Sequence, residues 1–383
     1  MPKTTQESVL HMAMELSNKK WRLGFQAANR RRFVSIDARD LAALDAAVAV
    51  AMGKLGLPKN ALVVSCYEAG RDGFWIHRAL LQRGIDNIVV DSASIEVNRR
   101  KRRAKTDRID VKKLLKQLVR HRGGEEDVWS IVRVPSVEGE DGRRNHRERD
   151  RLVKEQGQHS SRIKSLLALQ GVTLTTVNRW LPKKLDELRI WDGSPLPSAL
   201  KEEILREHVR WHLVHQQLLK LEADRETALR ASTPAPAGTP STQLDEARSL
   251  TALKGIGTTS SWKLVHEFFW RDFSNRRQVG AAAGLTGTPY DSGESAREQG
   301  ISKAGNASIR ALMVELSWCW LRFQPQSALS QWYLERFARG KRFRKVGIVA
   351  LARRLLIALW RYVKHGVVPA GATFKATTEG TTA

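Results

Sequence analysis

Apolar and polar positions along the first 120 residues follow a pattern typical of strands that alternate with helices. Three short strands are expected in succession, at residues 8–16, 21–27 and 32–37. Helices and buried strands then alternate, with helices expected at 41–55, 74–82 and 108–120 and strands at 61–67 and 87–91. This order predicts a mixed α/β sheet with helices on its faces.

Beyond residue 143 the pattern changes to long, charged helices. Trp211, Val214, Leu218 and Leu221 recur at spacings of three and four, as in the apolar seam of a coiled coil. Because only two heptads are clear, a helical hairpin that packs on itself is nearly as good an alternative. A stretch rich in Pro and Gly at 232–241 follows, and it cannot form regular structure.

The predicted fold class is therefore α/β plus α, in five segments. They are an α/β domain at 8–125, a helical connector at 140–231, a Pro-rich linker at 232–245, a mostly helical domain at 246–366 and a disordered tail at 367–383.

Charge changes this picture more than any other property of the composition. The 383 residues include 65 Lys and Arg against 40 Asp and Glu, which gives a formal net charge of +25. A charge of this size favours an anionic partner, and nucleic acid is the usual one because each neutralised phosphate releases a counterion. A basic ribosomal or membrane-surface protein is the alternative.

Other features narrow the class further. Cys66 and Cys319 are too few for a disulfide framework or a cysteine zinc site. The N-terminus lacks the apolar run of a signal peptide. The apolar stretch 346–363 is broken by three arginines, so it predicts an amphipathic helix rather than a membrane span. We expect a soluble cytoplasmic protein without a membrane partner.

Four acidic residues in the first domain are candidate metal ligands. Glu68 directly follows a buried strand, and Glu15 lies near the end of the first strand. Asp107 and Asp110 stand three apart at a helix start, which places both on one face. Their hard oxygen ligands suit Mg²⁺ or Mn²⁺. Acidic residues are also favoured at helix starts and in turns, which is the structural alternative.

A cationic run directly precedes the Asp pair. It consists of Arg99, Arg100, Lys101, Arg102, Arg103 and Lys105. Such a run is usually a solvated loop. Beside candidate metal ligands it would also guide phosphates toward the ions.

The C-terminal domain offers a second group of candidate residues. Gly255 and Gly257 stand in a turn that resembles a helix-hairpin-helix unit, in which backbone amides approach a phosphate. Ser292 stands in a hydroxyl-rich stretch at 284–295 that we expect to be an irregular loop, and Ser295 is nearly as good a nucleophile candidate.

Cations of the same domain could contact nucleic acid. Lys303 or Arg310 could stabilise charge on a phosphate under attack. A later basic cluster, which includes Arg342, Arg344 and Lys345, is a candidate contact surface for nucleic acid.

These motifs together resemble the IS110 family of transposases. The N-terminal matches are Cys66-Tyr67-Glu68-Ala69-Gly70, Val89-Val90-Asp91 and Lys105-Thr106-Asp107-Arg108-Ile109-Asp110. The C-terminal matches are Leu253-Lys254-Gly255-Ile256-Gly257, Gly284-Leu285, Ser292-Gly293-Glu294-Ser295 and Ile301-Ser302-Lys303-Ala304-Gly305-Asn306. The resemblance implies a RuvC-like, RNase H-fold domain with an Asp-Glu-Asp-Asp set, followed by a second domain that carries a serine.

The resemblance also implies roles and partners. Glu68, Asp107 and Asp110 match the metal-binding acids, and Ser292 matches the serine that attacks DNA, which favours it over Ser295. A structured RNA from the mobile element would pair with donor and target DNA. Assembly into a dimer or tetramer through the helical connector is implied too, in a bacterial cytoplasm close to the nucleoid.

Two positions depart from the family pattern. Glu15 stands where aspartate is usual, and Gly287 stands where proline is commoner. Glutamate reaches one methylene further toward a Mg²⁺ ion that demands tight geometry. Two other functions therefore stay open: a metal-dependent junction nuclease that uses water, and an inactive relic that only binds nucleic acid.

Overall fold

The computed structural model describes residues 9–95, 107–231, 241–292, 295–338 and 340–376. The chain divides into two compact units, Met1–Pro135 and Ser136–Ala383. The cationic run at 99–105 and most of the Pro-rich linker lie outside the described residues.

The N-terminal unit is built on a five-stranded sheet with the order β3-β2-β1-β4-β5. Its strands are β1 Val9–Leu16, β2 Lys20–Ala27, β3 Arg30–Asp37, β4 Leu62–Glu68 and β5 Asp86–Val90. β1, β2 and β3 form an antiparallel meander, and β4 and β5 add in parallel beside β1. The predicted mixed α/β sheet is confirmed.

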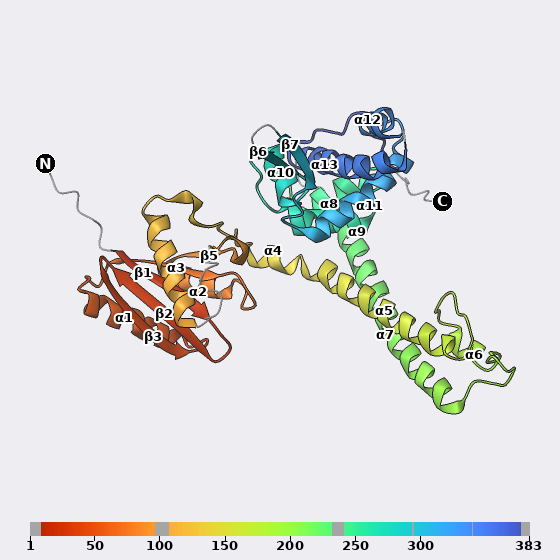
Figure 1. Ribbon diagram of the computed structural model, residues 1–383, viewed down its shortest axis with the longest axis horizontal. Helices are drawn as coiled ribbons and strands as arrows, with labels where there is room; N and C mark the ends of the chain where they lie inside the picture. The colour runs from red at the N-terminus through yellow and green to blue at the C-terminus, as the bar shows by residue number, and fades with distance from the viewer. Residues whose placement is uncertain (1–8, 96–106, 232–240, 293–294, 339, 377–383) are drawn as a thin grey trace. The chain divides into compact units, whose positions relative to one another are not determined.

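Helices cover both faces of this sheet (Figure 1). They are α1 Leu41–Leu55, α2 Trp75–Gln82 and α3 Asp107–Arg122, and two short 3₁₀ turns lie at Ser92–Ser94 and Glu126–Val128. α1 ends at Gly56 with φ 76°, a left-handed conformation that glycine adopts without steric cost. The helix predicted at 41–55 is confirmed with the same bounds.

Side-chain alternation along β1 and β4 creates the two cores. Met12, Met14 and Tyr67 pack against α1 and α2 on one face. Ala13 and Cys66, which point to the opposite face, pack against α3. The N-terminal unit is therefore a three-layer sandwich, with α1 and α2 on one side and α3 on the other.

The second unit begins with a helical hairpin. Its elements are α4 Val137–Asp141, α5 Arg144–Ala168, α6 Leu181–Lys184 and α7 Ser198–Ala231, and α5 and α7 lie side by side (Figure 1). Val214 and Leu218 of the predicted seam are buried against Leu152 of α5. The seam therefore closes the hairpin within one chain, which is one of the two alternatives that the sequence allowed.

The rest of the second unit is largely helical. It contains α8 Gln243–Ala252, α9 Thr258–Lys263, a π-helical turn η4 Leu264–Phe269, α10 Arg276–Ala282, β6 Gly287–Ser292, β7 Ser295–Ile301, α11 Ala307–Phe323, α12 Ala328–Phe337 and α13 Lys341–His365. Its core joins residues from α8, η4, α11 and α13, among them Leu250, Phe268, Met313 and Leu355.

Two expectations for the C-terminal region were wrong. The stretch around Ser292 is not an irregular loop, because β6 and β7 pair as an antiparallel hairpin from Gly287↔Ile301 to Ser292↔Ser295. Cross-strand hydrogen bonds satisfy this backbone without the apolar alternation by which a buried strand is recognised.

The predicted disordered tail is also ordered where it is described. The backbone N–H of Lys375 donates to the carbonyl oxygen of Ala252, and Thr373 bonds the side chain of Gln324. Small polar residues suggested fraying, but fixed partners on α8 and next to α11 hold residues 373 and 375 in place.

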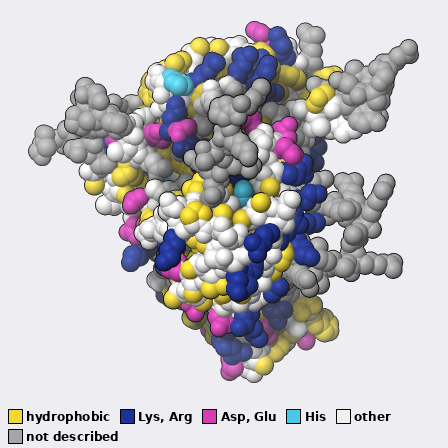
Figure 2. Space-filling view, turned by 90° about the vertical axis from the view of Figure 1, so that its left-hand side faces the viewer, with side chains coloured by type: hydrophobic (Ala, Val, Ile, Leu, Met, Phe, Trp, Pro, Cys, Tyr) yellow, Lys and Arg dark blue, Asp and Glu magenta, His cyan; other side chains and the backbone are white. Residues whose placement is uncertain are grey.

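The described surface agrees with the composition. The face drawn in Figure 2 carries many Lys and Arg side chains and fewer Asp and Glu. No helix in the described part of the chain is long and apolar enough to cross a membrane.

Candidate active site

Glu15 and Glu68 lie on neighbouring strands of the N-terminal sheet. The parallel register of β1 and β4 pairs Met14 with Tyr67, and the glutamates follow directly on each strand. Strands pair at about 4.8 Å, so the two backbones are close here. Alternation places Glu15 on the face of Ala13 and Glu68 on the face of Cys66, the face that α3 covers. The sheet therefore brings two predicted ligands together.

The direction of α3 brings the other two acids to the same end of the sheet. The Cys66 thiol lies 3.9 Å from the carbonyl oxygen of Leu114, in the middle of α3. At its last residue, Arg122 bonds Asp86 at the start of β5, with Nη2 and Oδ2 2.5 Å apart. The helix packs mainly against β1 and β2 and then crosses β4, and its first residues, Asp107 and Asp110, lie at the end of the helix away from Asp86 and the start of β5.

The exposure of these acids suits ligand binding more than a structural role. Glu68 is exposed, and Glu15 and Asp110 are half-buried. Arg22 of β2 stands opposite Glu15 in the antiparallel register and donates to the Ser35 hydroxyl at 2.8 Å. No three His, Cys, Asp or Glu side chains form a metal-binding group among the side chains that the structure describes, a set that excludes Asp107.

Cys66 lies beside this site but is unsuited to its chemistry. The side chain is completely buried under α3. Burial raises the pKa of the Cys66 thiol far above its ordinary value, so the thiol stays protonated. The candidate site at this edge of the sheet is therefore a site of oxygen ligands.

Ser292 is the last residue of β6, and its backbone pairs with that of Ser295 at the end of the ladder. The side chains of both serines lie outside the described part of the structure. The described base of the hairpin is well anchored, because the Ser302 N–H donates to the carbonyl oxygen of Thr286 at 2.8 Å. The structure thus positions the backbone of the predicted nucleophile on a two-stranded projection.

Two glycines of the family-like motifs allow two turns to pack closely at the base of this hairpin. Gly284 (φ 65°) and Gly305 (φ 84°) stand in these two turns, each against the backbone of the other turn. A Cβ on Gly284 would overlap the carbonyl oxygen of Ala304, and a Cβ on Gly305 would overlap that of Ala282. These motif positions are therefore required by close backbone contact.

Arg310 holds the same two turns from α11. Its Nη1 donates to the carbonyl oxygens of Ala283 and Lys303, each at 3.1 Å. The structure thus gives the guanidinium a scaffolding contact. Lys303 is exposed in the second turn, with φ 55°.

Of the other residues predicted to contact nucleic acid, some pack inside the second unit and others are exposed on its surface. Gly255 (φ 86°) faces α11, where a Cβ would come within 3.3 Å of Phe323. Gly257 is exposed and directly precedes α9, while Arg344 and Lys345 are exposed on α13. The Arg342 side chain and the run from Arg99 to Lys105 lie outside the described residues. Nucleic-acid contacts by these groups stay predictions.

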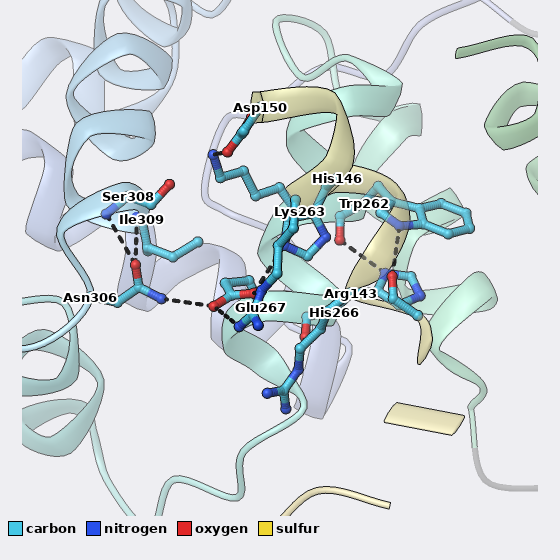
Figure 3. A network of polar contacts seen from close by, with 12 residues as sticks. Arg143, His146, Asp150, Trp262, Lys263, His266, Glu267, Asn306, Ser308 and Ile309 are labelled. Atoms are coloured by element: carbon cyan, nitrogen blue, oxygen red, sulfur yellow. Dashed lines mark hydrogen bonds and ion pairs between the residues drawn. The ribbon is translucent and has the colours of Figure 1, made fainter. Parts of the chain in front are cut away.

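A buried polar network around Glu267 was missed by the sequence reasoning (Figure 3). Glu267 lies on the π-helical turn and accepts hydrogen bonds from His146 Nε2 at 2.9 Å and Arg147 Nη2 at 2.9 Å, and more distantly from Asn306 Nδ2 at 3.5 Å. Burial alone would raise the pKa of Glu267, but the bonds and charges of His146 and Arg147 outweigh it and lower the pKa to about 2.

A second part of the network fixes the start of α5 against η4. The His266 ring stacks on Trp262 with centroids 4.3 Å apart, and Gly142 leaves room for it because a Cβ there would overlap the imidazole. Arg143 stacks over Trp270 at 4.0 Å and donates to the carbonyl oxygen of His266. Burial lowers the pKa of His266 to about 4. The only sequence signal was a set of ordinary charged residues more than a hundred positions apart.

The strand order and the mixture of strand directions place the N-terminal unit in the RNase H-like class of folds. Residues 247–331 match the family described as "Transposase IS116/IS110/IS902 family". The y4rJ protein of Sinorhizobium fredii is 42% identical over 376 residues, which cover 96% of this chain and 94% of that protein. The chain belongs to the IS116/IS110/IS902 family, and it is a transposase.

A more distant relative carries a more explicit name. The transposase for insertion sequence element IS1328 of Yersinia enterocolitica is 24% identical over 230 residues, which cover 58% of this chain and 63% of that protein. A transposase acts on DNA, so the predicted DNA partner is confirmed at this level.

Proposed function

We propose that this transposase cuts and rejoins DNA with two separate groups of residues. Glu15, Glu68, Asp107 and Asp110 form a metal-binding site in the RNase H-like unit, and Ser292 supplies the attacking hydroxyl. The observation that carries the proposal is the pairing of β1 with β4, which sets Glu15 beside Glu68 on the face where α3 begins.

The donor set fits a hard divalent cation, Mg²⁺ or Mn²⁺. All four groups are carboxylates, and the buried Cys66 thiol adds no soft ligand. When bound, such an ion stabilises negative charge on the oxygens of the reacting phosphate. The carboxylates would hold the ion at the end of the sheet, and Arg22, opposite Glu15, offsets part of their mutual repulsion.

The serine step is a transesterification. The Ser292 hydroxyl oxygen attacks phosphorus, a new P–O bond forms, and the bond to one deoxyribose oxygen breaks. The serine proton passes to solvent, and the leaving oxygen takes up a proton in turn. The resulting phosphoserine link conserves the energy of the phosphodiester, so the reverse attack by a different DNA end rejoins the strand without an added energy source.

Guidance by an RNA is part of the proposal. The net charge of +25 favours contact with long stretches of phosphate backbone, to which a guide RNA would contribute. Base pairing between a guide RNA and the donor and target DNA would supply sequence specificity, while the protein contacts mainly backbones. Assembly of two or four copies would then hold both DNA partners at once.

Covalent capture of DNA tests the proposal. The purified chain is incubated with RNA from the flank of its element, Mg²⁺ and labelled junction DNA, and then denatured. We expect an adduct that survives denaturation and disappears in Ser292→Ala. Ser295→Ala, which alters the residue paired with Ser292 across the ladder, is the matched control and should retain the adduct.

Other outcomes would replace the proposal. Cleaved DNA without an adduct, unchanged in Ser292→Ala, would favour a junction nuclease that uses water. Binding that is steeply salt-dependent but indifferent to Mg²⁺ and to all these substitutions would indicate a nucleic-acid-binding relic. Activity that appears only in Glu15→Asp would identify the longer glutamate side chain as the defect of this copy.

A further inference from the structure

A groove of about 1030 Å³ runs along the outward face of α13 in the second unit. One wall is the base of the β6–β7 hairpin, with Gly287 and Ile301. The other wall is α12 together with residues 367–370. The groove therefore adjoins the projection that carries the backbone of Ser292, although it contains none of the residues assigned above to the chemistry.

The charged residues that line this groove are all positive. Its lining includes five cations and no carboxylate; the cations are Arg276, Lys345, Arg353, Arg354 and Arg361. None of the five has an ion-pair partner within the described ranges. Cations gathered without counterions attract a polyanion, because each phosphate bound would release condensed salt ions.

The floor of the groove suits flat apolar groups. Between the cations, α13 presents Val346, Val349, Ile357 and neighbouring small residues. The guanidinium of Arg354 lies over the Trp332 ring at 3.9 Å, which forms a broad flat surface of the kind on which bases stack. An unpaired base offers an apolar face to such a floor, whereas a duplex keeps its bases inside.

The length of the groove matches a short single strand. From Lys345 to Arg361 the helix rises about 24 Å, at roughly 1.5 Å per residue. A single-stranded site of this kind takes about 4 nucleotides or more. From Gly287 to Ser292, β6 spans about 17 Å at roughly 3.4 Å per residue. A nucleic-acid strand held in the groove would therefore reach the end of the hairpin within a few nucleotides.

We propose that the α13 groove binds single-stranded DNA that flanks the phosphodiester attacked at the end of β6. This inference rests on the proposed role of Ser292. The five cations that line the groove bind the phosphates, and the bases stack on its floor, which consists of the apolar residues of α13 and Trp332. The groove would thereby fix the position of the cut strand relative to the hairpin.

A protein segment is a poorer occupant of this groove. An apolar helix from a second copy would cover five cations with no carboxylate to pair with them, and each buried unpaired charge is costly. A single strand of DNA supplies one negative charge for each nucleotide as well as an apolar base. Its chemistry therefore matches both the cations and the floor of the groove.

Direct binding tests the proposal without any chemical step. The full chain is titrated with a fluorescent 12-nucleotide oligo-dT in EDTA, which removes divalent ions. Lys345→Ala/Arg361→Ala is the test variant, because both side chains are exposed and make no ion pair within the described structure. Arg151→Ala/Arg206→Ala on the helical hairpin is the control of equal charge change.

We expect the test variant to bind oligo-dT at least about 10-fold more weakly than the control variant. The slope of log Kd against log salt should fall by roughly 0.7 for each phosphate that the variant no longer binds. Equal affinity of the two variants would overturn the proposal. An unchanged thermal unfolding midpoint shows that the test variant is folded, and Lys345→Ala alone replaces it if the midpoint falls.

Three further probes separate the DNA strand from other occupants. Oligo-U that binds more tightly than oligo-dT, with the same dependence on Lys345 and Arg361, would assign the groove to RNA and overturn the proposal. Duplex DNA that competes as well as oligo-dT would also overturn it. Self-association that Val349→Asp abolishes, with oligo-dT binding unchanged, would assign the groove to a second copy.

Adduct formation links the groove to the serine. In the wild-type chain, shortening the single-stranded flank below about 4 nucleotides should reduce the yield of the covalent adduct, whereas the test variant should be insensitive to flank length. If the adduct persists in Ser292→Ala, the proposed function fails, and the oligo-dT titration still decides whether the groove binds DNA.

Discussion

Glu68 and Glu267 are both glutamates at or near the end of a regular element, yet their surroundings differ in kind. Glu68 ends β4, is exposed, and shares its sheet edge with Glu15. Glu267 lies on a π-helical turn and is held by His146, Arg147 and Asn306. A carboxylate whose neighbours are other carboxylates needs a cation from outside. A carboxylate whose neighbours are donors is already satisfied and stabilises the fold.

The largest expected difference is in activity. Glu68→Gln should reduce strand transfer by on the order of 10³-fold, because several kcal/mol of metal-assisted stabilisation of the transition state would be absent. Its free energy of unfolding should change by less than about 0.5 kcal/mol, since the side chain is exposed. Asp45→Asn, on α1 at the opposite face of the sheet, is the control, and full activity of Glu68→Gln in the adduct assay would remove Glu68 from the site.

A large effect on stability is expected at the base of the hairpin. Gly284→Ala places a methyl group against the Ala304 carbonyl at a positive φ, so the two turns must separate. We expect a loss of at least about 3 kcal/mol in denaturant unfolding. Gly300→Ala, at φ 89° in open space on β7, carries the backbone strain alone and should lose clearly less. Equal losses would show that close packing at Gly284 is unimportant.

The buried network should make the second unit sensitive to acid. His266 has a pKa of about 4 when folded, against an ordinary value of 6.5. Between these values the unfolded chain binds a proton that the folded chain excludes, so the free energy of unfolding falls as the pH drops from 6.5 toward 4, by roughly 2 to 3 kcal/mol. Glu267 acts in a lower window, and its contribution disappears as the pH falls from 4.5 toward 2.

His266→Phe separates the two contributions. The phenyl ring can keep the stack on Trp262 but cannot titrate. Unfolding of this variant, measured across the pH range, should lose the dependence between 6.5 and 4 and keep the one below 4.5. An unchanged slope between 6.5 and 4 would show that another group causes it.

A smaller loss is expected when Glu267 itself is neutralised. Glu267→Gln keeps the shape but weakens the charge-assisted bonds from His146 and Arg147, which should cost about 1 to 2 kcal/mol of unfolding free energy. Glu148→Gln, an exposed neighbour on α5, should change stability by less than about 0.5 kcal/mol. Matching losses in the two variants would show that the network contributes no more than a surface ion pair.

The N-terminal unit was predictable because its core obeys local patterns. The strand signals at residues 8–16, the short apolar run at 61–67 and the glycine after residue 55 define two of its strands and its first helix. β4 is buried on both faces, so burial of one face does not set its register. The strand ends that carry Glu15 and Glu68 could be predicted, but the pairing that sets them side by side is a tertiary fact.

The C-terminal unit resisted prediction where its structure depends on distant partners. The hairpin around Ser292 lacks apolar alternation, and residues 373–375 are held by α8 and Gln324 rather than by any local signal. Arg310 resembled a phosphate-binding residue, yet its guanidinium joins two turns. In the sequence, a polar residue that binds a ligand and one that holds two turns together look alike when both stand near glycines. No local pattern distinguishes the two roles.

The sequence by itself determined the mixed sheet, the helix ends marked by glycine, the excess of positive charge and the motifs that indicate the transposase family. These are properties of neighbouring residues or of sums over the chain. Only the tertiary structure decided which carboxylates adjoin, that the half-buried Glu267 is surrounded by donors, and that five cations of the second unit line one groove. Such features depend on contacts between residues tens to more than a hundred positions apart, and local propensity carries no information about them.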